Sequence, residues 1–116
     1  MSARLKPTNA PISELKAQLF RALAHPARIR ALEVLSEGER SVSELQPLVG
    51  IEASHLSQQL AVLRRAGLVT SRKEGTSVLY AIRDDKAIEL LRVAKQLLIN
   101  SLADTTDLLR DLRAAR

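Results

Sequence analysis

The segment 53–69, ASHLSQQLAVLRRAGLV, carries hydrogen-bonding side chains at spacings that suit one surface of a helix. We expect five polar side chains in its first turns to face away from a core: Ser54, His55, Ser57, Gln58 and Gln59. Serine hydroxyls can hydrogen-bond to bases and phosphates, and a glutamine amide can bond to adenine N6 and N7, which discriminates between bases by ~1–3 kcal/mol. The pattern favours recognition of base-pair edges.

Enzymatic chemistry has much weaker support in this sequence. Ser57 and His55 are of the right types for a nucleophile and a general base, but residues two apart on a helix point in different directions. The four glycines are spread singly and form no phosphate-binding loop. The chain has no cysteine, which excludes disulfides, thiolate metal sites and cysteine nucleophiles together. We therefore predict a protein that is not an enzyme and needs no cofactor.

Composition narrows the class of partner. The 116 residues are 46% hydrophobic, enough for one domain with a core, and 18 Lys and Arg against 13 Asp and Glu give a net charge of +5. Aromatic residues make up only 2% of the chain, whereas proteins that hold single strands usually stack bases on several rings. The positive charge favours a polyanionic partner, and the scarcity of aromatic residues favours double-stranded DNA over single strands. No apolar run is long enough for a signal peptide or a membrane span, so we expect a cytoplasmic protein without a membrane partner.

Four helices are predicted before residue 67. Pro26 suits the first position of the second helix, and Gly38 follows its end. Ser41 and Glu44 have the spacing of a capping box at the start of a short third helix, which Gly50 terminates. The expected ranges are 13–24, 26–37, 41–49 and 53–66. The last two, joined by a tight turn with a glycine, form a helix-turn-helix.

A β-hairpin and a long helix are predicted after Gly67. The period changes to two in LVTSRK and SVLYAI, on either side of the turn EGT. Arg72 and Lys73 near the tip are candidates for phosphate contacts, and Arg64 either contacts DNA or complements the dipole of its helix. Apolar residues at helical spacing from 84 to 113 predict a single helix of roughly 45 Å, which is longer than the domain's own core needs. Such a helix is expected to pack on a second copy.

The order helix, helix, helix-turn-helix, hairpin, helix is that of a winged helix, a mainly α fold with a small β-hairpin. The stretches FRALAHPARIRALEVL, SHLSQQLAVLRRAGLV and RKEGTSVLYAI resemble the ArsR/SmtB family of bacterial transcriptional regulators, and the resemblance covers about residues 13–113. It implies a homodimer whose first and last helices form the interface and whose recognition helices enter successive major grooves of an inverted-repeat operator. Ser54, Ser57 and Gln58 occupy the base- and phosphate-contacting positions of the family, whereas Gln59 stands where many members have histidine.

These arguments give a domain division and two residue sets. We expect a flexible basic arm over residues 1–11 and one dimeric winged helix-turn-helix domain over residues 12–113. The predicted contacts to double-stranded promoter DNA come from Ser54, His55, Ser57, Gln58, Gln59, Arg64, Arg72 and Lys73. The predicted dimer contacts come from Leu15, Leu19, Leu91, Leu98, Leu102 and Leu109.

The resemblance also implies metal sensing, for which the ligands are largely missing. The family's thiolate site needs cysteines, and the third helix here contains ELQPLVG. Its site on the last helix needs histidines, and none follows His55 although Asp84 and Asp85 are present. We predict no metal site, and a packing or capping role for His25. Two alternatives stay open: a nickel- or zinc-responsive regulator with a site free of cysteine, and a protein-interaction module that does not bind DNA. The sequence identifies no effector, and it does not distinguish repression from activation.

Overall fold

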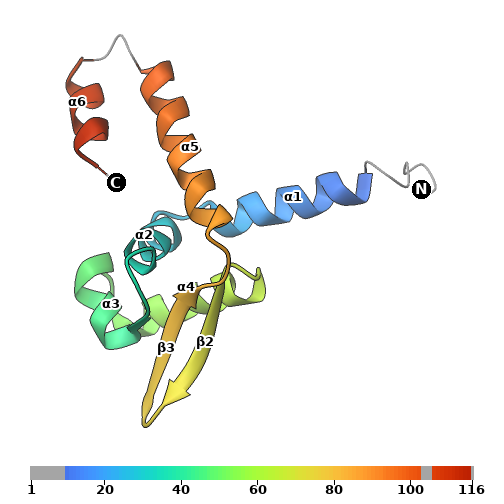
Figure 1. Cartoon of the computed structure of the whole chain (residues 1–116), viewed down its shortest axis with the longest axis vertical. Coiled ribbons are helices and arrows are strands. Elements are labelled where there is room, and N and C mark those ends of the chain that lie inside the picture. The colour runs from blue at the N-terminus through green and yellow to red at the C-terminus, as the bar shows by residue number, and fades with distance from the viewer. Residues whose placement is uncertain (1–9, 103–105, 116) are drawn as a thin grey trace.

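The computed structural model describes residues 10–102 and 106–115 and has the winged helix-turn-helix architecture (Figure 1). Its helices and strands are α1 (Ala10–Leu23), α2 (Pro26–Leu35), β1 (Arg40–Ser41), α3 (Val42–Val49), α4 (Ala53–Arg65), β2 (Val69–Glu74), β3 (Ser77–Ile82), α5 (Lys86–Ser101) and α6 (Thr106–Ala114). Helix α1 begins within the arm predicted over 1–11. The rest of that predicted arm lies outside the described residues.

The short helices have side chains that stabilise their ends. The Nδ1 of His25 accepts a hydrogen bond from the Ala27 backbone N–H at 3.0 Å, so this histidine caps α2. At the start of α3, the Ser41 hydroxyl accepts from the Glu44 N–H and the Glu44 carboxylate accepts from the Ser41 N–H, which completes the predicted capping box. Gly50 ends α3 with a φ of 85°, a left-handed conformation that glycine adopts without a steric penalty.

The wing is a three-stranded antiparallel sheet with the order β1-β3-β2. In the predicted hairpin, Val69 lies opposite Ile82 and Glu74 lies opposite Ser77. Strand β1 was not expected from the sequence, because two residues are too few to show an alternating pattern. Arg40 in this strand lies opposite Tyr80 of β3, which fixes the base of the wing beside the start of α3.

One hydrophobic core joins the helices to the sheet. Helix α4 contributes three leucines at positions i, i+4 and i+7, and the wing contributes Val69. The buried core residues are Ala22, Leu23, Ala31, Leu32, Val34, Leu35, Leu45, Leu56, Leu60, Leu63, Leu68, Val69 and Ala87. Only the last two residues of α1 and the first turn of α5 belong to this set, so most of both helices lies outside the core.

The prediction of one continuous helix over 84–113 is wrong. The segment forms α5 and α6, and α6 turns back alongside α5, where Lys95 donates a hydrogen bond from Nζ to the carbonyl of Ala115 (Figure 1). The 16 residues of α5 span about 24 Å at 1.5 Å per residue, not the 45 Å expected. The sequence from the last two residues of α5 to the first residue of α6, NSLADTT at 100–106, is rich in Asn, Ser, Asp and Thr, whose side chains compete for backbone hydrogen bonds and lower the helix propensity.

Helices α1 and α5 project from the body of the molecule (Figure 1). Several of their apolar side chains are exposed. The radius of gyration is 16.7 Å, against about 13 Å for a compact domain of this length. The exposed apolar side chains of the two helices are Ile12, Leu15, Phe20, Val93, Leu97 and Leu98. Of the predicted dimer contacts, Leu15 and Leu98 are exposed, and the other four are half-buried. Across the described ranges, every helix is too short or too polar to cross a bilayer.

The capping box of α3 should make the stability of the fold sensitive to acid. Hydrogen bonds from Ser41 hold the pKa of Glu44 below its ordinary value. A lowered folded-state pKa stabilises the protein fully above the ordinary glutamate pKa of about 4.3, and this contribution is lost as the pH falls through the folded-state value. Ser41→Ala should lower the free energy of unfolding by about 1 kcal/mol at neutral pH. Denaturant unfolding at a series of pH values measures both effects.

The matched variants for this test are Glu44→Gln and Glu52→Gln. The first should flatten the loss of stability below about pH 4.3, because the titrating carboxylate of the box is gone. Glu52 precedes α4 and makes no side-chain capping bond, so its replacement should leave the acid response unchanged. An identical acid response in the wild type and both variants would contradict the role assigned to Glu44.

Candidate nucleic-acid interface

The outward face of α4 is polar because the opposite face is anchored in the core. That anchor, called here the leucine stripe, consists of Leu56, Leu60 and Leu63, all with 0% exposure. Ser54, Ser57 and Gln58 lie on the solvent side and are exposed. Their hydroxyl and amide groups make no hydrogen bond within residues 10–102 and 106–115, so they are available to a ligand.

Arg65 extends this face at the end of the helix, which the sequence analysis did not anticipate. Positions 54, 58, 61 and 65 follow the spacing i, i+4, i+7 and i+11, so Arg65 shares a side of α4 with Ser54 and Gln58. Arg64 is also exposed and lies seven residues after Ser57, so it shares the Ser57 side of this face. The signal for Arg65 was present in the sequence as helical spacing.

The expectation that Gln59 faces outward is wrong. Its side chain is 9% exposed and belongs to the buried side of α4. Positions 56, 59, 60 and 63 all lie on one side of a helix, and the amide oxygen of Gln59 accepts a hydrogen bond from Arg28 Nη1 at 2.7 Å. Arg28, on α2, supplies the partner that lets this polar group be buried, and the sequence analysis gave Arg28 no role.

His55 lies at the edge of the outward face and meets His25. The two rings are edge-to-face with their centroids 6.0 Å apart, although 30 positions separate them in the chain. His25 uses Nδ1 to cap α2, so its Nε2 remains for other contacts. No group of three or more His, Asp or Glu side chains positioned to hold a metal ion occurs in residues 10–102 and 106–115. The pair therefore lacks a third ligand in this part of the chain.

The two cations of the wing have different environments. Arg72 Nε and Nη2 donate to the two carboxylate oxygens of Glu39, each at 2.8 Å, and Nη1 lies 3.4 Å from Glu74. These carboxylates raise the pKa of Arg72 above its ordinary range, and Arg72 lowers the pKa of Glu39. Lys73 is exposed and has no ion pair in the described part of the chain. Arg72 thus joins the wing to the turn before β1, and Lys73 is the cation of the pair that is available to a phosphate.

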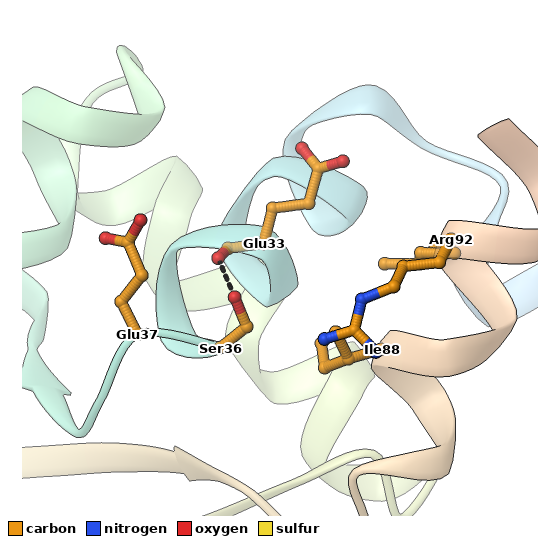
Figure 2. A pocket seen from close by; sticks show the side chains of 6 residues that line it. Glu33, Ser36, Glu37, Ile88 and Arg92 are labelled. Carbon is orange, nitrogen blue, oxygen red and sulfur yellow. Dashed lines mark hydrogen bonds between the residues drawn. The ribbon is translucent and has the colours of Figure 1, made fainter. Parts of the chain in front are cut away.

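A small cavity lies between α2 and α5, away from the outward face of α4. Figure 2 shows Glu33, Ser36 and Glu37 on one side of it and Ile88 and Arg92 on the other. Its volume is about 140 Å³, whereas sites for small organic molecules usually measure about 300–1,000 Å³. The Ser36 hydroxyl is directed back to the Glu33 carbonyl at 2.5 Å rather than into the space. This cavity gives no support to an effector site.

Comparison with known proteins agrees with this geometry. Residues 25–71 match the model of the family described as "Bacterial regulatory protein, arsR family". The HTH-type transcriptional regulator Rv0081 of Mycobacterium tuberculosis is 52% identical over 105 residues, which is 90% of this chain and 92% of the relative. Its crystal structure superposes with a TM-score of 0.75 at 50% identity, over 84% of this chain and 99% of that one.

Two further relatives extend the comparison. The biofilm growth-associated repressor of Agrobacterium fabrum is 45% identical over 75 residues, covering 65% of this chain and 64% of the relative. The homodimeric winged helix-turn-helix DNA-binding domain of Mb0332 from Mycobacterium bovis has a TM-score of 0.72 at 28% identity, over 81% of this chain and 87% of that one. The matched proteins are regulators and not enzymes. The chain is a member of the arsR family of bacterial regulatory proteins, with a winged helix-turn-helix that binds DNA.

Proposed function

We propose that this protein regulates transcription by binding, as a homodimer, to a pseudo-palindromic operator in a promoter. The observation that carries the proposal is the outward face of α4, where Ser54, Ser57 and Gln58 are exposed opposite the leucine stripe. Short side chains let the helix backbone approach the floor of the major groove, and the glutamine amide suits a bidentate contact to adenine. Arg65 on the same face is placed for a phosphate.

Lys73 adds a contact that does not depend on sequence. It is exposed on β2 near the turn of the wing, and a lysine beside the backbone of DNA binds phosphate as a point charge. The pair of hydrogen bonds from Arg72 to the Glu39 carboxylate holds the wing at a defined place beside α3, so the position of Lys73 relative to α4 is set by the fold. The net charge of +5 favours association with the polyanion.

Two helices supply the dimer surface. Ile12, Leu15 and Phe20 on α1 are more than half exposed, as are Val93 and Leu97 on α5. Leu19 of α1 and Leu90 of α5 line the same hollow, which joins the two helices at the body of the molecule. The homodimeric structure of the Mycobacterium bovis relative supports covering this surface with a second copy. Two-fold symmetry would then place the recognition helices in half-sites ~34–36 Å apart.

We infer that the protein acts in the cytoplasm and represses transcription by binding to a promoter. The Agrobacterium fabrum relative is named a repressor, and a dimer seated on a promoter blocks access of other proteins to it. We assign no metal ligand to the chain: there is no cysteine in the sequence, and His25 and His55 have no third partner among the described residues. The protein would therefore respond to a signal other than a thiolate-bound metal.

Fluorescence anisotropy with the DNA upstream of its own gene and a scrambled duplex tests the function directly. We expect selective binding in chelator that added nickel or zinc does not change. A shift in affinity of about tenfold, or ~1.4 kcal/mol of coupling, would establish a metal site in a chain to which we assign none. Equal affinity for both duplexes at physiological salt would contradict operator recognition and favour a protein-interaction module.

Changes on the outward face of α4 should reduce specificity. Ser57→Ala and Gln58→Ala should each weaken binding to the preferred site by about 1–3 kcal/mol and change binding to random DNA much less, because base-edge bonds are lost. Both residues are exposed, so stability should be unaffected. Equal losses on both duplexes would rule out base recognition by these side chains.

The wing variant should show the opposite behaviour. Lys73→Ala should weaken binding to specific and random duplexes alike, and the slope of log K against log salt should fall by about one. Glu74→Gln is the matched control, because it removes a neighbouring carboxylate without removing a cation. It should strengthen binding to both duplexes slightly. A loss confined to the specific duplex in Lys73→Ala would contradict a phosphate contact.

A charge on the exposed face of α5 should separate the dimer. Leu98 is 50% exposed, and Leu98→Glu would place a carboxylate in the proposed interface, where burial of an unpaired charge is unfavourable. Leu48→Glu is the control, since Leu48 is 42% exposed on α3, away from α1 and α5. Sedimentation at micromolar concentration should give a monomer for the first variant and a dimer for the second. A monomeric wild type would overturn the dimer proposal.

A further inference from the structure

The Arg28 guanidinium connects the end of α1 to α4, the proposed recognition helix. From α2, its Nε donates to the Ala22 carbonyl at 2.7 Å and its Nη2 donates to the Arg21 carbonyl at 3.2 Å. Its Nη1 donates to the amide oxygen of Gln59 on α4 at 2.7 Å. One planar group therefore holds backbone atoms of α1 and a side chain of α4 at the same time.

Two of these bonds satisfy groups with no other donor in the described part of the chain, the Ala22 carbonyl and the Gln59 amide oxygen, whereas the Arg21 carbonyl also accepts from the Ala24 N–H at 3.1 Å. The last carbonyls of a helix have no hydrogen-bond donor within the helix, and Ala22 and Arg21 lie in the last turn of α1. A cation there also complements the helix dipole. Gln59 is 9% exposed, so its amide oxygen would be buried without a partner if Arg28 moved. The guanidinium is rigid and its donors diverge, so displacement of either helix breaks at least one bond.

The position of α1 depends on this region because little else holds the helix. Ala22 and Leu23 are its buried residues, Leu19 is partly buried against the core, and the remainder of its described length is exposed. The carbonyls that Arg28 binds belong to this same last turn. A small change in the angle of α1 at the Arg28 contacts becomes a larger displacement at the other end of the helix, because its 14 residues are about 21 Å long.

We propose that Arg28 and Gln59 are positioning residues that set the distance and angle between the two recognition helices, and so the half-site spacing that the operator must have. The inference rests on the proposed homodimer, in which α1 takes part in the interface. Because Gln59 is turned away from the outward face of α4, it determines spacing without contacting a base. Gln58, its exposed neighbour, determines which bases are bound.

The distance between the recognition helices can be measured without DNA. The chain has no cysteine, so Ser54→Cys on the exposed start of α4 gives one site per protomer for a nitroxide label. Pulsed electron spin resonance should give a narrow inter-label distance in the otherwise wild-type dimer. Gln59→Met, which keeps size but removes the acceptor, and Arg28→Lys, which keeps charge but removes the planar group, should each broaden or shift it.

Binding to DNA supplies the second measurement. Unlabelled proteins are titrated with single half-sites and with inverted repeats whose spacing is changed by one or two base pairs. In Gln59→Met and Arg28→Lys, the preference for the best spacing should fall about fivefold or more, the lower end of typical coupling between sites, while half-site affinity stays within about twofold. Gln59→Glu keeps an oxygen acceptor for Arg28 and should retain the wild-type spacing preference. Gln58→Met should lose half-site affinity and keep the spacing preference.

The outcomes separate this inference from the proposed function. A wild type that is monomeric or that does not select an operator would remove the homodimer proposal itself. A dimeric, operator-selective wild type together with unchanged distances and spacing preference in folded Gln59→Met and Arg28→Lys would overturn the positioning role alone. Circular dichroism establishes folding of each variant, and Arg28→Lys, which leaves the core side of α4 intact, serves if Gln59→Met does not fold.

Discussion

Burial of the leucine stripe on α4 is the constraint on which the rest of the site depends. Leu56, Leu60 and Leu63 have no exposed surface, and full burial of a leucine side chain contributes roughly 1.5–3 kcal/mol. Rotating α4 by one residue, about 100°, would bring a leucine into water and Gln58 toward the core. The hydrophobic effect therefore fixes which polar side chains face outward, although it does not contribute to the contacts that those side chains make with DNA.

Polar contacts then fix the position of the segments that hydrophobic packing holds only in part, namely α1 and the wing. The leucine stripe sets the rotation of α4 but gives little control over α1, most of which lies outside the core. Directional bonds act at this joint, where Arg28 binds two carbonyls of α1 and one amide of α4. The wing is held in the same way, because the two hydrogen bonds from Arg72 to the Glu39 carboxylate join an exposed strand to the turn before β1. In both places an arginine fork gives a geometry that nonpolar contact alone does not specify.

The sequence was sufficient for features that depend on neighbours along the chain. Three such features depend on short spacings, and the structure contains all of them: the leucine stripe, the capping box of Ser41 and Glu44, and the hairpin. The contacts of Gln59 and Arg72, which the sequence did not reveal, involve partners far apart in the chain. Gln59 is buried because of an arginine 31 positions away, and Arg72 is engaged by a glutamate 33 positions away. A polar residue on the core side of a helix is predictable from spacing, but the partner that permits its burial is not.

The break between α5 and α6 changes the physical basis for a dimer. Helix length no longer argues for a second copy, because α6 turns back and α5 is only 16 residues long. The apolar surface nevertheless survives. Arg92, Lys95, Gln96 and Ile99 of α5 line the hollow that Arg113 of α6 shares, which places α6 on that side of the helix. Val93 and Leu97 stay 59% and 65% exposed on another side. Since α6 leaves this side of α5 uncovered, the same helix can carry α6 and present an apolar face to a partner protomer.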